Sequence, residues 1–155
     1  IIAQNYGAMN FNRIRETFYT AIKYALFIMI LASIAIFLLA DSVTSVFSNN
    51  PEVIDYGKRY LKISAIVLPA YPLFFISNGL FMSLKKSENA MISNIVRNLL
   101  LPVSVFYLAK YLSADFNTFF WLWVLFNWTY SIIYLSIVIY YLRNRLDKSR
   151  AVVNP

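Results

Sequence analysis

Four long apolar runs, separated by short charged connectors, constrain this sequence more than any other feature. The runs cover residues 24–40, 63–84, 89–109 and 116–142. A helix of about 20 residues crosses the roughly 30 Å hydrocarbon core of a bilayer, so each run predicts one membrane span. We therefore expect an all-α fold, a multi-pass transmembrane helical bundle with four full spans.

The composition supports a membrane environment. Hydrophobic residues make up 60% of the chain and charged residues only 14%, whereas a soluble domain carries about a quarter charged residues. The net charge of +7 could suggest nucleic-acid binding, but the basic residues lie at the ends of the runs, where membrane topology explains them. We expect the lipid bilayer as a partner and no nucleic acid.

The distribution of basic residues predicts the orientation. If the N-terminal lead-in is cytoplasmic, nine basic residues in cytoplasmic connectors stand against four on the other side. We therefore expect a protein of the cell (plasma or inner) membrane with a cytoplasmic C-terminus. The cytoplasmic set is Arg13, Arg15, Lys23, Lys85, Lys86, Arg143, Arg145, Lys148 and Arg150, and the opposite set is Lys58, Arg59, Lys62 and Lys110.

The sequence lacks the residues that several kinds of catalytic and metal site require. The chain has no Cys and no His, which excludes Cys/His metal sites and Ser-His-Asp triads. It also lacks a dinucleotide fingerprint, a P-loop and an HExxH motif, so we expect no enzyme, no cofactor and no bound metal. The seven acidic residues lie in connectors or near span ends, so the spans lack the buried carboxylate that an ion-coupled transporter needs.

Arg97 is the one ionisable residue deep inside a run. Helical spacing places it on one face with two asparagines, and that face should point to the bundle or to a wet cavity because lipid exposure is costly. Arg97 could tie helices together, take part in substrate or ion passage, or snorkel toward the surface. The residues of this face are Ala90, Asn94, Arg97, Asn98, Leu101 and Val105.

The second run carries an aromatic and methionine face. Such surfaces accept varied flat or cationic ligands, although they also simply pack helices. Pro69 and Pro72 lie within this run and predict a kink or a broken turn. The face consists of Ser64, Tyr71, Phe75, Asn78 and Met82, with Phe74 at its edge.

A similar face of the fourth run is expected to form hydrogen bonds between helices. Its residues are Trp123, Asn127, Tyr130, Ser131 and Tyr134.

A family resemblance begins at the N-terminus. Residues 4–10 read Gln-Asn-Tyr-Gly-Ala-Met-Asn, and this segment resembles the Gln-Asn-x-Gly-Ala-x-Asn signature of the multidrug and toxic compound extrusion (MATE) family. Residues 47–54 and 60–63 are similar to the segment that joins two consecutive spans of that family. Residues 81–86 and 94–97 resemble further family segments. The motif residues are Gln4, Asn5, Gly7 and Ala8.

The resemblance implies a transporter of twelve helices in two lobes that exports drugs or organic cations against Na⁺ or H⁺. This chain would form the C-terminal lobe from the end of helix eight to helix twelve, and the N-terminal lobe would be missing. Residues 1–10 would close helix eight and form a cytoplasmic turn, residues 11–142 would form the four-helix part, and residues 143–155 a basic cytoplasmic tail. The coupling ion would bind outside this segment.

The resemblance also implies a substrate cavity. Its candidate residues are Tyr71, Phe75, Asn78, Met82, Asn94, Arg97 and Asn98. Two positions depart from the family pattern, because Lys85 stands where glycine is usual and Met82 where glutamine is common. Two other functions stay open, a flippase of lipid-linked oligosaccharides from the same superfamily and a membrane subunit that does not transport.

Overall fold

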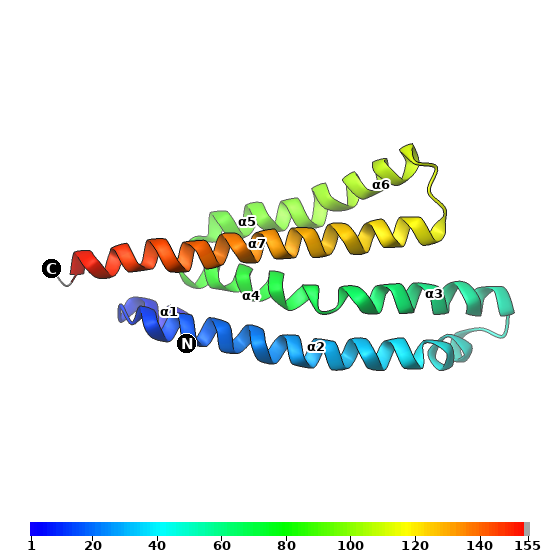
Figure 1. The fold of residues 1–155 in the computed structure, drawn as a ribbon, viewed down its shortest axis with the longest axis horizontal. Helices are drawn as coiled ribbons and strands as arrows, with labels where there is room; N and C mark the ends of the chain where they lie inside the picture. The colour runs from blue at the N-terminus through cyan, green and yellow to red at the C-terminus, as the bar shows by residue number, and fades with distance from the viewer. Residues whose placement is uncertain (154–155) are drawn as a thin grey trace.

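The computed structural model describes the backbone of residues 1–153 and the side chains of residues 1–144 (Figure 1). Throughout this part the regular structure is helical, which confirms the all-α prediction. The elements are α1 (Ile2–Gly7), α2 (Phe11–Phe47), α3 (Pro51–Val67), α4 (Ala70–Ser83), α5 (Ser87–Ile95), a π-helical turn (Val96–Leu100), α6 (Leu101–Tyr111) and α7 (Phe116–Val153).

Three or four of these segments can cross a membrane. The helix Phe11–Phe47, the stretch Ser87–Tyr111 and the stretch Phe116–Asn144 are each long and apolar enough. The pair α3 and α4 meets the same criteria together but is bent by 44°. The four predicted spans are therefore present when the bent pair counts as one span.

The bend between α3 and α4 lies at the predicted proline. The last turn of α3 ends with a bond from the Leu68 N–H to the Ala65 carbonyl at 3.2 Å, and α4 begins after Pro69. Proline has no N–H to continue the helical ladder, so the chain breaks here. The predicted kink is confirmed.

The π-helical turn was not expected from the sequence. It holds Arg97 and directly precedes Pro102 in the first turn of α6. Because Pro102 cannot donate to the carbonyl four residues earlier, and its ring crowds that carbonyl, a wider turn relieves both problems.

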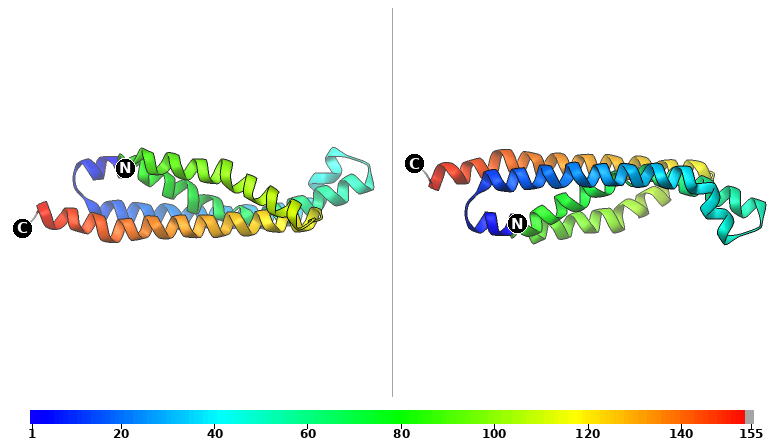
Figure 2. Two further views of the ribbon diagram at one scale, coloured as in Figure 1. Left: turned by 90° about the horizontal axis from the view of Figure 1, so that it is seen from above. Right: turned by 90° about the horizontal axis from the view of Figure 1, so that it is seen from below.

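The long helices run along one axis, with α2 and α7 in one layer and α1, α4 and α5 in another (Figure 2). Both termini and the turn between α4 and α5 lie at one end of the bundle, and the α2–α3 and α6–α7 connections lie at the other (Figure 1). The Arg15 Nη2 donates to the Leu142 carbonyl at 2.9 Å, which ties α2 to α7 at the first end. The turn that holds Lys85 and Lys86 thus lies at the first end, and the end of α6 that holds Lys110 lies at the other. The helix α7 continues past residue 142, where we expected the tail to begin.

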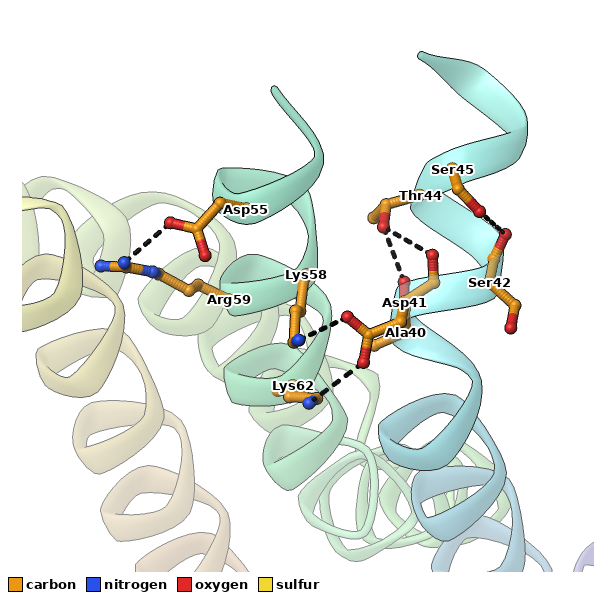
Figure 3. Close-up of polar contacts among 9 residues, drawn as sticks. All are labelled: Ala40, Asp41, Ser42, Thr44, Ser45, Asp55, Lys58, Arg59 and Lys62. Carbon is orange, nitrogen blue, oxygen red and sulfur yellow. Dashed lines mark hydrogen bonds and ion pairs between the residues drawn. The ribbon is translucent and has the colours of Figure 1, made fainter. Parts of the chain in front are cut away.

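The α2–α3 connection carries a group of exposed ion pairs (Figure 3). The Asp41 carboxylate lies 2.5 Å from the Lys58 Nζ and 3.5 Å from the Lys62 Nζ, and Arg59 pairs with Asp55 within α3. Exposed pairs of this kind add little stability. We therefore assign them to the alignment of the two helix ends rather than to a binding site.

The last helix begins with a side-chain cap. The Asp115 carboxylate accepts a hydrogen bond from the Thr118 backbone N–H at 3.1 Å, and this satisfies one free donor of the first turn of α7. Hydrogen bonds from the Thr118 side chain and backbone hold the pKa of Asp115 below its usual range. The cap therefore stays charged at neutral pH.

Three helix ends use a left-handed residue that is not glycine. In each case the residue has a φ near +50°, and the N–H of the next residue bonds back to a carbonyl five positions earlier, as in a Schellman motif. A side chain in this conformation is strained, and glycine is the usual choice. The residues are Met9 (φ 55°), Lys85 (φ 57°) and Ser113 (φ 49°).

Replacing Lys85 with glycine is expected to raise the free energy of unfolding by about 1 kcal/mol, because glycine removes the Cβ strain of the left-handed region. Lys85 is also the position where the family resemblance expects glycine. Thermal unfolding of the detergent-purified protein measures the effect. The control is Lys86→Gly, whose φ of −108° needs no glycine. If Lys85→Gly raises the stability no more than Lys86→Gly does, the strain at residue 85 is not relieved by glycine.

Candidate functional site

Arg97 lies inside a cluster of aromatic rings. Its guanidinium carbon is 4.2 Å from the ring centre of Phe74, 4.9 Å from that of Phe75 and 5.0 Å from that of Tyr71. All three rings belong to α4, and only 6% of the Arg97 surface is exposed. The negative faces of the rings attract the guanidinium, and this attraction strengthens when water is excluded. We call this group the Arg97 cage.

The Arg97 guanidinium has no polar partner in the described part of the chain. No hydrogen bond or ion pair joins it to a described residue, and its Nη1 is fully buried. All six acidic side chains that the structure describes are exposed and lie at the helix ends or in connectors. Burying a cation without a carboxylate or carbonyl partner lowers the stability of the fold. A guanidinium that is nevertheless buried in this way is a candidate for a functional role.

A pair of hydroxyl groups lies next to the Arg97 cage. The Tyr130 hydroxyl donates to the Ser93 carbonyl at 2.9 Å and lies 2.7 Å from the Ser93 hydroxyl. The ring of Tyr130 is 5.9 Å from that of Phe74, and Ser93 lies one turn before Arg97. The pair links α5 to α7 and closes the cage on the side of α7.

A second hydrogen bond joins α7 to α4. The Tyr134 hydroxyl donates to the Asn78 side-chain oxygen at 3.3 Å, and the Tyr134 ring stacks on that of Tyr130 with an interplanar angle of 7°. Interhelical bonding by this face of α7 is thus confirmed for Tyr130 and Tyr134. It is wrong for Asn127, whose amide donates to the Trp123 carbonyl of its own helix.

Phe74 is the centre of the site rather than its edge, which corrects the expectation from the sequence. Its side chain is fully buried, and its ring contacts Arg97, Tyr130 and Tyr134. Helical spacing placed Phe74 beside the expected face, but it could not show that α7 packs against that side of α4. Ser93 was missed as well, and its only signal was its position one turn before Arg97.

The structure separates the predicted cavity residues. Tyr71 and Phe75 join Arg97 in the cage, and Asn78 bonds Tyr134, as described above. Met82 is exposed, as is Phe75.

The two asparagines of the third span do not join the cage. The Asn94 amide donates to the Ala90 carbonyl of its own helix at 2.9 Å. Asn98 is exposed, so the expectation that it shares the buried face of Arg97 is wrong. Adjacent residues point about 100° apart around a helix, which is enough to carry Asn98 away from that face.

The motif segment borders a separate cavity. A cavity of about 660 Å³ lies between α1 and the end of α4, lined in part by Gly7, Tyr6, Met82 and Lys85. A Cβ added at Gly7 would meet no atom within 4 Å, and Gly7 has no positive φ. Gly7 therefore contributes open space here, and the turn itself depends on Met9.

The site offers hydrogen-bond donors and aromatic surface. Among the described residues no three His, Cys, Asp or Glu side chains are grouped closely enough to hold a metal ion. Two further buried hydroxyl groups, Ser77 and Ser131, have no hydrogen-bond partner. These donors and rings can recognise a ligand.

Comparison with known proteins identifies the family. The MatE family model matches residues 1–108, which include the Gln4–Ala8 motif, the Arg97 cage on α4 and the π-helical turn. No curated protein matches the chain. Since the match covers well over half of the sequence, and the structure has the helical spans that the family requires, this chain belongs to the MATE family of membrane transporters.

Proposed function

We propose that this chain is the C-terminal portion of a cation-coupled efflux antiporter that exports drugs or organic cations by alternating access. Membership of a transporter family supports transport over catalysis. The observation that carries the proposal is the uncovered aromatic and methionine surface of α4. Phe75, which belongs to the Arg97 cage, is 59% exposed, and Met82, which lines the motif cavity, is 60% exposed. Such a surface adapts to ligands of different shape.

The substrate cavity in this proposal includes the seven predicted residues together with Phe74. The bend between α3 and α4 and the π-helical turn interrupt two of the spans that carry these residues. Interrupted helices bend more readily than continuous ones, which suits a protein that alternates between two open states. The cavity residues are Tyr71, Phe75, Asn78, Met82, Asn94, Arg97 and Asn98.

The coupling ion, Na⁺ or H⁺, is proposed to bind in the N-terminal lobe or in the helices before residue 1. No described acidic side chain is buried, and ion coupling in a membrane needs a buried carboxylate.

A flippase for pyrophosphate-linked lipids would need several basic residues in its cavity. Arg97 is the one buried basic side chain among those described, so the exporter is favoured.

We further propose the cell membrane as the location, with the C-terminus in the cytoplasm. Two connections support this orientation under the positive-inside rule. The turn between α4 and α5, which holds Lys85 and Lys86, lies at the same end as both termini, and the end of α6, which holds Lys110, lies at the opposite end (Figure 1).

Export by proteoliposomes tests the proposal. The whole transporter that contains this chain should export a fluorescent organic cation under a Na⁺ or proton gradient, and export should stop when an ionophore collapses the gradient. Vesicles that hold residues 1–155 alone should export nothing, because none of the six carboxylates that the structure describes is buried as a coupling site requires. Export that does not depend on either gradient would contradict the proposal of a cation-coupled antiporter. Gradient-driven export by residues 1–155 alone would show that the coupling-ion site lies within this segment.

A further inference from the structure

The depth of Arg97 limits what can neutralise it. Arg97 follows Glu88, which lies at the start of α5, by nine residues, or roughly 14 Å along the helix axis. That distance places the guanidinium near the middle of a span about 30 Å thick. Lipid phosphates lie at the membrane surface and do not reach this depth, so the partner of Arg97 comes from a compound in the cavity or from the protein.

The aromatic faces of the cage are already used. Tyr71, Phe74 and Phe75 all face the Arg97 guanidinium within 5.0 Å. An organic cation that approached these faces would compete with Arg97 for the same negative surface and would be repelled by its charge. The part of the surface that first suggested cation recognition is therefore unfavourable for a cation.

The N–H groups of Arg97 remain free for an acceptor. Nη1 is buried without a partner, and no described residue accepts a hydrogen bond from the other nitrogens. A guanidinium presents paired donors whose spacing matches a carboxylate, and such charge-assisted bonds are about twice as strong as neutral ones. The neighbouring hydroxyl groups of Ser93 and Tyr130 bond each other and so leave this acceptor position open.

We propose that Arg97 binds a carboxylate of the transported compound, so that the substrates of this surface are carboxylate-bearing, zwitterionic or anionic organic molecules. The inference rests on the proposed export function and selects, among the drugs named there, those that carry a carboxylate over plain organic cations. Carboxylate binding supplies the acceptor that the buried guanidinium lacks and leaves the three aromatic contacts in place. Phe75, which is exposed, then offers its free face to the apolar body of the compound.

A pair of dyes that differ only at the carboxyl group tests the inference. Rhodamine 110 carries a free carboxylic acid, and rhodamine 123 is its methyl ester. In proteoliposomes with the whole transporter and an imposed cation gradient, Arg97→Gln should lower kcat/KM for the free acid about tenfold or more, the loss expected for hydrogen bonds to a charged group. The value for the ester should not fall, because the ester is a cation without a carboxylate, and the loss of the Arg97 charge removes a repulsion rather than a bond.

Two further variants make the result specific. Arg97→Lys keeps the charge but loses the paired donors, so an intermediate loss for the free acid is expected. If the Arg97→Gln protein does not fold, Arg97→Lys still tests the inference. The matched control is Arg59→Gln, which removes an exposed arginine from the opposite end of the bundle and should change neither dye.

The outcomes separate the inference from the proposed function. An equal fall for both dyes in Arg97→Gln and Arg97→Lys overturns the inference, because it shows that Arg97 holds a carboxylate of the protein or only supports the structure. Unchanged export of both dyes overturns it as well. If the unsubstituted transporter moves neither dye under either gradient, it is the proposed function that fails.

Discussion

Replacing Phe74 with alanine is expected to lower the free energy of unfolding by about 3 kcal/mol, at the lower end of the range for buried phenylalanine. The ring is fully buried and contacts Arg97, Tyr130 and Tyr134. The lower end applies because lipid is as apolar as the protein interior, so the loss comes from packing rather than from transfer out of water.

The loss of the ring also affects Arg97. At 4.2 Å, Phe74 makes the shortest of the three cation–π contacts. Without it the guanidinium keeps only the rings of Tyr71 and Phe75 and gains no hydrogen bond in exchange. Phe74→Leu separates the two effects, because leucine restores much of the volume but offers no π face. We expect Phe74→Leu to recover about half of the stability while export of the free-acid dye stays reduced.

Thermal unfolding of the detergent-purified transporter measures the change, with Phe75→Ala as the matched control. Phe75 is the adjacent ring on the same helix and is 59% exposed, so its loss should cost less than about 1 kcal/mol. If the two alanine variants were equally stable, Phe74 would not be the centre of the cluster.

The features that the sequence predicted correctly depend on local patterns. Charge-free runs of sufficient length predict spans wherever they occur, and Pro69 breaks a helix whatever its neighbours are. The motif of residues 4–8 likewise identified the family without any knowledge of the packing.

The features that the sequence did not predict depend on which helices become neighbours. The central place of Phe74 and the bond between Ser93 and Tyr130 both require α7 to lie against α4 and α5, and no local pattern encodes that pairing. The π-helical turn shows a different limit, since Pro102 predicts a disturbance of the helix but not its form. The assignment of the seven cavity residues stays a prediction.

Replacing Gly57 with alanine is expected to destabilise the contact between α2 and α3. A Cβ at Gly57 would lie 2.8 Å from the Thr44 Cγ2, closer than real carbon atoms approach each other. Thr44 cannot easily rotate away, because its hydroxyl donates to the Ala40 carbonyl at 2.9 Å and also lies within bonding distance of the Asp41 carbonyl (Figure 3). Overpacking of this kind costs about 1–3 kcal/mol.

A matched glycine is available as the control. Gly79 lies inside α4, and a Cβ added there would meet nothing within 4 Å. Alanine at residue 79 should raise the stability by up to about 1 kcal/mol through helix propensity alone. Since Gly57 is also within a helix, the difference between the two variants in thermal unfolding isolates the steric cost of the Cβ at residue 57.

A second substitution in Gly57→Ala tests the cause of that cost. Thr44→Ser removes the Cγ2 methyl group but keeps the hydroxyl that bonds the α2 backbone, so the double variant should regain most of the stability that Gly57→Ala loses. Thr44→Ser alone should change little, because it leaves only a small gap at the helix contact. If the double variant is as unstable as Gly57→Ala, the methyl group is not the obstacle. Recovery would show that the close approach of α2 and α3, which aligns Asp41 with Lys58 and Lys62, depends on the absence of a side chain at Gly57.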